Sequence, residues 1–141
     1  MEKYYSTRNT NDRVSFSTGV TRGLSPDGGL YVPESFTNID IYDEKYLKMS
    51  YQELAVDILS NFLDGYTKEE VTTFVSEAYG DNFETKDIVP VKTCDKVNFL
   101  ELFRGPTLAF KDMALQILPK FMVAAARKEG ITDEIVVLTA T

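Results

Sequence analysis

One stretch of the sequence places a lysine where amine chemistry is favoured. Residues 102–112 read L-F-R-G-P-T-L-A-F-K-D, and Lys111 lies between a loop and the expected start of a helix. Apolar neighbours should partly desolvate its ammonium group, and the positive end of a helix dipole should disfavour that charge further. Both effects favour the neutral amine. Since only the free amine attacks an aldehyde, Lys111 is a candidate Schiff-base lysine.

The same residues also have ordinary structural interpretations, which composition alone favours. Lys111 could be a surface lysine whose aliphatic stem lies along an amphipathic helix. Asp112 could cap that helix or stabilise its first turn. The segment Gly105-Pro106-Thr107 could be only a turn. The spacing of these residues leaves both sets of alternatives open.

Composition restricts the kinds of site that the chain can carry. Of its 141 residues, 43% are hydrophobic and 26% are charged, which is ordinary for one soluble globular domain. The sequence contains no histidine, so it excludes Ser-His-Asp catalysis, Cys-His catalysis and His-dependent zinc sites. The single cysteine, Cys94, cannot form an internal disulfide. We expect no metal site.

Charge and hydropathy limit the partners and the location. The 15 Lys and Arg residues against 22 Asp and Glu give a formal net charge of −7, whereas nucleic acids and anionic membrane surfaces require clustered basic residues. The longest apolar stretches are far too short to span a bilayer, and the first residues lack the apolar core of a signal peptide. We therefore expect a cytoplasmic protein without a nucleic-acid or membrane partner.

The elements that precede the lysine motif begin with a short helix and a turn. Residues 14–24 can form the helix, with Ser15 or Ser17 as its N-cap. The sequence S-P-D-G-G at 25–29 predicts a tight turn, because proline presets φ and glycine accepts positive φ. A short strand should follow at residues 30–32.

Two further helices are indicated by paired capping signals. Ser50 with Glu53, and Thr67 with Glu70, each form the pattern of a capping box ahead of apolar residues at helical spacing. Gly65 is placed to end the first helix. The two segments predict an αα-hairpin that buries its apolar stripes against a neighbouring element.

The second half of the sequence predicts a β-loop-α-β unit. Strands are expected at residues 88–91 and 97–103, followed by a helix over 112–128 that Pro119 should kink or break. A buried type of strand is expected at 135–138, which suggests a parallel sheet. Because the sequence ends directly after this strand, we expect a chain that has been cut short.

The stretch 102–112 closely resembles the lysine motif of the threonine synthase family, which belongs to the fold-type II enzymes that use pyridoxal 5'-phosphate (PLP). Further blocks resemble the same family in the same order. They are K-Y-Y-S-T-R at 3–8, V-S-F-S at 14–17, G-L-S-P-D-G-G-L-Y-V-P at 23–33 and V-V-L-T-A-T at 136–141. The last block is similar to the strand that leads into the family's phosphate-binding loop, so the resemblance spans nearly the whole chain.

The resemblance implies an α/β fold class with two parts. Residues 1–82 would form an N-terminal α+β domain. Residues 83–141 would be the first part of a PLP-binding domain with a parallel sheet, similar to the β subunit of tryptophan synthase. That second domain would be incomplete in this chain.

The resemblance also implies a reaction and its site residues. Members of the family convert O-phospho-L-homoserine and water to L-threonine and phosphate through a PLP Schiff base. Lys111 aligns with the lysine that binds PLP and transfers protons at the substrate carbons. Phe110 and Asp112 match the flanks of the motif and are expected at the cofactor in positioning roles.

Two departures from the family pattern leave alternatives open. Arg104 stands where many members have histidine, and an arginine can supply a cationic contact but cannot exchange protons near neutral pH. The family's phosphate-binding loop would follow Thr141, so the chain alone is expected to be inactive and to bind PLP poorly. The alternatives are another fold-type II lyase, such as a serine/threonine dehydratase, and a short non-catalytic interaction module.

Overall fold

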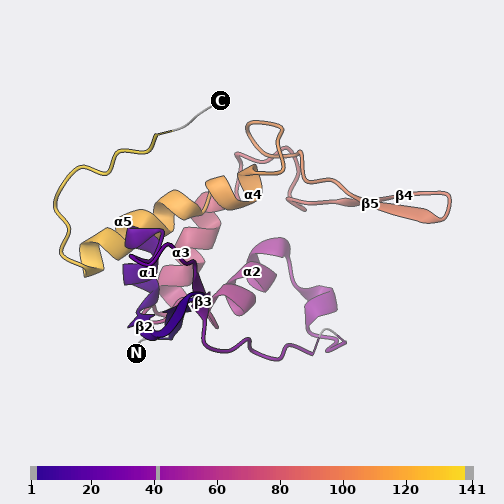
Figure 1. Ribbon diagram of the computed structural model, residues 1–141. Coiled ribbons are helices and arrows are strands. Elements are labelled where there is room, and N and C mark those ends of the chain that lie inside the picture. The colour runs from indigo at the N-terminus through magenta and orange to yellow at the C-terminus, as the bar shows by residue number, and fades with distance from the viewer. Residues whose placement is uncertain (1–2, 41, 139–141) are drawn as a thin grey trace.

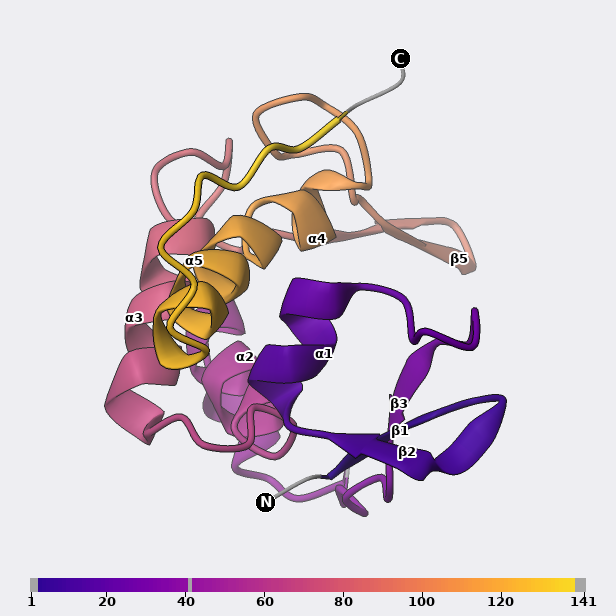
Figure 2. The same cartoon turned by 60° about the vertical axis from the view of Figure 1, so that its left-hand side comes forward.

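The chain has a mixed α/β structure whose body is made by helices. The computed structural model describes residues 3–40 and 42–138. Helix α1 (Phe16–Arg22) packs against α5 (Leu118–Lys128), and a small sheet lies at one end of α1 (Figure 1, Figure 2). A hairpin of β4 (Val91–Cys94) and β5 (Val97–Leu100) projects from this body as an arm (Figure 1).

The N-terminal sheet is antiparallel and has the strand order β2-β1-β3. Strand β1 spans Tyr4–Ser6, β2 spans Asn9–Val14 and β3 spans Tyr31–Pro33. The strand after the turn was therefore predicted to within one residue, whereas β1 and β2 were not predicted. The turn before β3 is tight, because the Asp27 carboxylate accepts hydrogen bonds from the Ser6 hydroxyl and from the amide of Gly29 at 2.7 Å.

The N-terminal capping signals of the sequence are confirmed, whereas the helix that Gly65 was expected to end already ends at Leu59. The Ser15 hydroxyl accepts a hydrogen bond from the amide of Thr18 at the start of α1. Helices α2 (Tyr51–Leu59) and α3 (Lys68–Ala78) both begin with a complete capping box. Each box satisfies two backbone donors that a helix start otherwise leaves unpaired.

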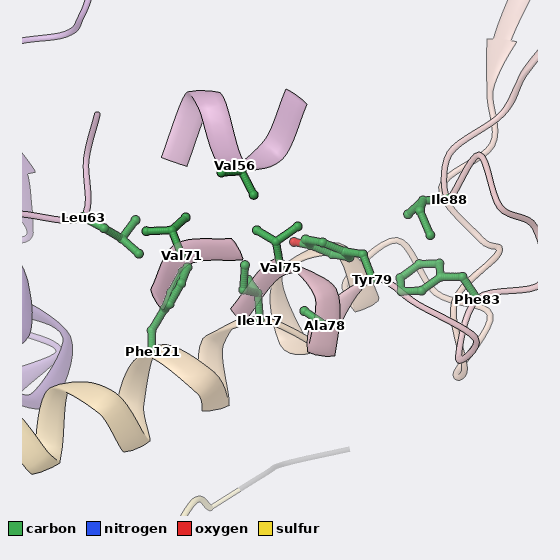
Figure 3. Close-up of a cluster of buried hydrophobic side chains, with 10 residues drawn as sticks. All are labelled: Val56, Leu63, Val71, Val75, Ala78, Tyr79, Phe83, Ile88, Ile117 and Phe121. Atoms are coloured by element: carbon green, nitrogen blue, oxygen red, sulfur yellow. The ribbon is translucent and has the colours of Figure 1, made fainter. Parts of the chain in front are cut away.

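The core lies between α2, α3 and the first turn of α5. Val71 and Val75 of α3 are fully buried, and residues from before and after them in the chain surround them (Figure 3). Ile117 and Phe121 are part of the same cluster, although they follow the domain boundary expected at 82/83. The division into two domains stays a prediction. The cluster consists of Val56, Leu63, Val71, Val75, Ala78, Tyr79, Phe83, Ile88, Ile117 and Phe121.

The helix expected over 112–128 is broken, as Pro119 indicated. A short helix, α4, spans Asp112–Leu115, and α5 begins at Leu118 after two intervening residues. Proline stands at the second position of α5, where its missing N–H has no intrahelical acceptor to lose.

Three strand predictions in the second half are corrected by the structure. The strand expected over 97–103 ends at Leu100. The first strand begins at Val91 rather than at Ile88, because Ile88 is buried in the helical core and has a φ of 59° that no strand accepts. Residues 135–138 form no strand and are exposed, and Thr139 to Thr141 lie outside the described residues. Both sheets formed by the described residues are antiparallel. The expected parallel strand lacks a neighbour to pair with in this part of the chain.

Candidate functional site

The lysine motif forms a closed loop between the arm and α4. The loop leaves β5 after Leu100 and returns to the helical body at Asp112. A turn within it is closed by a hydrogen bond from the amide of Leu108 to the carbonyl of Gly105, at 3.1 Å. Residues 105–112 therefore form a compact unit around Lys111 rather than an extended connection.

The centre of this loop is the carboxylate of Asp112, which is fully buried. One carboxylate oxygen accepts the backbone N–H of Thr107 at 2.8 Å, and the other accepts the Thr107 hydroxyl, also at 2.8 Å. Asp112 is the first residue of α4, so the first-turn position expected from the sequence is confirmed. Its partner Thr107 was not predicted.

The surroundings of Asp112 keep its carboxyl ionised. Burial opposes the charge, but the hydrogen bonds from Thr107 and from the backbone of Ala109 outweigh that effect and hold the pKa of Asp112 below its ordinary value. The charge is therefore stabilised by donors of the loop itself.

Gly105 is required by the close approach of the loop to Asp112. A Cβ atom at position 105 would lie 2.5 Å from the Oδ2 atom of Asp112 and 2.6 Å from its Cβ atom. Such contacts are far inside van der Waals distance, so no larger residue fits without moving the loop. The turn at Gly105-Pro106-Thr107 therefore also packs directly against the side chain of Asp112.

Lys111 lies on the outside of the loop and is exposed to solvent. Among the described residues it forms no ion pair, so its amine is accessible to a ligand. The partial desolvation expected from its apolar neighbours is not provided by this part of the chain. Helix α4 is also only four residues long, which leaves little helix dipole at its start.

The apolar residues close to Lys111 in the motif are also exposed. Phe110 is 65% exposed and Leu108 is 71% exposed. Leu108 also has a φ of 59°, a left-handed conformation that is unfavourable for a leucine. The lysine motif therefore presents an aromatic ring and an aliphatic side chain to solvent at positions close to Lys111 in the chain.

Helix α4 is tied to the end of α3 by two side chains that the sequence did not single out. The hydroxyl of Tyr79 donates to the carbonyl of Met113 at 2.6 Å, and Asn82 donates to the side chain of Gln116 at 3.2 Å. Desolvation raises the pKa of Tyr79, and the nearby Tyr51 adds to the rise, so the phenol stays a donor. The sequence signal that could have indicated this link is a tyrosine directly after the apolar residues of α3.

Arg104 lies at the base of the arm, where it forms ion pairs within the chain. Its guanidinium contacts the carboxylate of Glu101 at 2.6 Å and that of Glu84 at 2.7 Å, and it lies over the ring of Phe103. The two carboxylates compensate its charge at the base of the arm. The cationic contact to a ligand that was expected from the sequence stays a prediction.

Two other kinds of feature are absent from the described residues. Within residues 3–40 and 42–138, no group of Cys, Asp and Glu side chains is arranged to hold a metal ion. No helix in the same residues is long and apolar enough to cross a membrane.

Comparison with known proteins gives a consistent result. The family model described as the N terminus of threonine synthase matches residues 3–79. The threonine synthase of Methylobacillus glycogenes is 34% identical over 98% of this chain, and that of Corynebacterium glutamicum is 34% identical over 97%. The chain spans 31% and 30% of the lengths of these two relatives.

Solved structures of the same kind of protein have the same fold. The PLP-bound threonine synthase of Brucella melitensis superimposes with a TM-score of 0.83 at 35% identity, over 92% of this chain and 28% of that one. The yeast threonine synthase gives a TM-score of 0.82 at 29% identity, over 93% of this chain and 28% of that one.

Proposed function

Because the chain belongs to the threonine synthase family, we propose that it is the part of a threonine synthase that carries the reactive lysine. The observation that supports this proposal is the exposed amine of Lys111, which has no ion-pair partner among the described residues and lies on a closed loop next to the exposed Phe110 in the chain. Residues 83–141 are then the first, incomplete part of a fold-type II PLP-binding domain. A cytoplasmic location stays the prediction made from the sequence.

The proposed reaction converts O-phospho-L-homoserine and water to L-threonine and phosphate. PLP, when bound, supplies an electron sink for negative charge that develops on the substrate carbons. The amine of Lys111 holds the cofactor and afterwards moves a proton at the α carbon of the substrate. The described residues fit the aldehyde end of the cofactor, since Lys111 is accessible and an aromatic ring lies next to it in the chain.

The test of this proposal is the site at which PLP becomes attached. The chain would be incubated with PLP, reduced with borohydride and mapped by peptide mass spectrometry. We expect Lys111 to be labelled faster than Lys86, an exposed lysine outside the motif. Lys111→Ala should remove the principal label, and Lys86→Ala should not. A principal label at any other lysine would contradict the assignment.

The 141 residues by themselves are proposed to bind PLP weakly and to lack activity. The support is that the chain spans about a third of the length of its relatives, and that phosphate groups are held by backbone donors at helix starts. Titration with PLP, followed by the absorbance of the bound cofactor, measures the affinity. Stoichiometric binding at micromolar concentration would contradict this second proposal while leaving the first intact.

A further inference from the structure

Two hydrogen bonds join the residues on either side of the reactive part of the loop. Thr107 donates its backbone N–H to one oxygen of Asp112 and its hydroxyl to the other, each at 2.8 Å. Main chain and side chain of one residue thus bind both acceptors of a single carboxylate. Neither residue can rotate without breaking a bond, so the segment of four residues between them has fixed ends.

The loop has a buried inner side, which holds the Asp112 carboxylate, and an exposed outer side. The Asp112 carboxylate is fully buried, and Gly105 leaves no space for another group beside it. Phe110 and Lys111, the residues directly before it, are exposed. A ligand that reaches the amine of Lys111 therefore meets the outside of the loop, whereas the carboxylate faces inward.

A role of Asp112 in helix capping alone does not account for these contacts. Helix α4 has only four residues, and a carboxylate that served the helix would bind its first backbone amides. Asp112 instead binds a residue five positions earlier in the chain. The left-handed backbone of Leu108, between the two partners, is a further sign that the loop is held in a conformation it would not adopt freely.

We propose that Thr107 and Asp112 are positioning residues, which fix the direction of Lys111 before a cofactor binds. The proposal rests on the proposed function, because that function gives Lys111 its role. It assigns a role to Thr107, and it has Asp112 act through the backbone of Lys111 rather than by contact with the cofactor. An amine with a fixed direction reacts faster than a free one, since less orientation is lost on the way to the transition state.

The two hydrogen bonds between Thr107 and Asp112 form a clamp, and three variants test its donors and acceptors separately. Thr107→Val keeps the shape and the amide but removes the hydroxyl, and Thr107→Ser keeps both donors. Asp112→Asn keeps the shape but replaces one acceptor by a donor. Since Thr107 is exposed, Thr107→Val is not expected to unfold the chain.

The first measurement is the backbone order of residues 107–111 by NMR relaxation, without any cofactor. We expect the order parameters of this segment to fall in Thr107→Val and Asp112→Asn and to stay unchanged in Thr107→Ser. Unchanged order in the first two variants would overturn the proposal, whatever the chemistry of Lys111.

The second measurement is the ratio of the labelling rates of Lys111 and Lys86 with PLP and borohydride. We expect this ratio to fall by about tenfold in Thr107→Val and Asp112→Asn, the factor typical of one lost hydrogen bond to a charged group, and to recover in Thr107→Ser. A general loss of stability affects both lysines and does not change the ratio in this way.

The outcomes distinguish the clamp from the function on which it rests. A preference for Lys111 that persists undiminished in both disruptive variants would overturn the clamp. Equal labelling of Lys111 and Lys86 in the unaltered chain would overturn the proposed function instead. In that case the NMR measurement still decides whether Thr107 and Asp112 hold the loop.

Discussion

Helix α3 and the arm place the same residue type in opposite surroundings. Val71 and Val75 of α3 are 0% exposed, whereas Val91 and Val97 of the arm are 60% and 54% exposed. Valine favours a half-buried strand by propensity, yet here it is buried in the helix and exposed in the hairpin. The difference lies in what each element can pack against among the described residues.

Helix α3 lies against α2 and α5, so its apolar stripe is covered on more than one side (Figure 3). Within the described part of the chain, the arm has only its own two strands, which pair from Val91 with Leu100 to Cys94 with Val97. An isolated two-stranded hairpin is at best marginally stable in water. Burial of valine in this chain therefore follows the number of packing partners rather than the residue type.

The largest loss of stability is expected when a side chain that closes the core is removed. Phe121 is 8% exposed and makes edge-to-face contacts with the rings of Phe16 at 5.5 Å and Phe74 at 5.8 Å. We expect Phe121→Ala to lower the free energy of unfolding by about 4 kcal/mol, because it leaves a cavity. Urea denaturation measures this loss. The matched control is Phe99→Ala in the arm, and an equal loss there would contradict the comparison.

A smaller effect is expected at the bond that ties α4 to the core. Tyr79→Phe removes the hydroxyl that donates to the carbonyl of Met113 while the ring keeps its contacts with Tyr51 and Phe83. We expect a loss of about 1 kcal/mol in the free energy of unfolding, the usual cost of one hydrogen bond. Thermal denaturation checks the size. Amide exchange should show the extra opening at residues 112–115, and opening confined to α2 would be evidence against this link.

The pH dependence of stability tests the Asp112 clamp with a definite sign. The pKa of Asp112 is lowered in the folded chain, so the unfolded chain binds its proton more readily. The stabilisation is present above the unfolded value, about 3.9, and is lost as the pH falls through the folded value below it. Urea midpoints of the unaltered chain and of Asp112→Asn should therefore converge as the pH falls from 5 to about 3.

Other carboxylates with lowered pKa values, Asp27 and Glu53 among them, also weaken the chain in acid. The contribution of Asp112 is therefore measured as the difference between the urea midpoints of the unaltered chain and Asp112→Asn. The pH dependence of either chain alone does not measure it. A difference that stays constant over this range, or grows in acid, would show that the charge of Asp112 does not stabilise the loop.

The smallest effect is expected on the face of the arm. Phe99 is 54% exposed and lies opposite Lys92 in the hairpin. Phe99→Thr should change the free energy of unfolding by less than about 0.5 kcal/mol, because little packing is lost. The variant should remain monomeric to a higher concentration, since it removes an exposed apolar ring next to a free strand edge. Light scattering against concentration checks this, and a large loss of stability would show that the arm is packed in solution.

The sequence predicted best what depends on neighbouring residues. The capping boxes at Ser50 and Thr67 and the break at Pro119 require only a few consecutive residues, and all three are confirmed. Strand β2 was missed because five of its six residues are polar, so no apolar alternation marked it. The strand expected at 135–138 was wrong because pairing partners, rather than local propensity, decide whether a β-type segment forms a strand.

The candidate site shows the same limit. The resemblance pointed to Lys111 and to its flanks, and the structure places Asp112 at the first turn of a helix, as its type indicated. Thr107 and Gly105 were considered only as parts of a turn. Their contacts with Asp112 depend on how the loop closes in three dimensions, and no periodicity in the sequence reports such a closure.

The position of Phe121 in the core also has a consequence for synthesis of the chain. Helices α2 and α3 are complete once Ala78 has been made, but the ring that covers Phe74 comes about 40 residues later. At roughly 5–20 residues per second, the ribosome takes about 2–8 s to add them. During that interval the apolar stripe of α3 is uncovered on one side, so the nascent chain is most exposed to chaperones and proteases before α5 emerges.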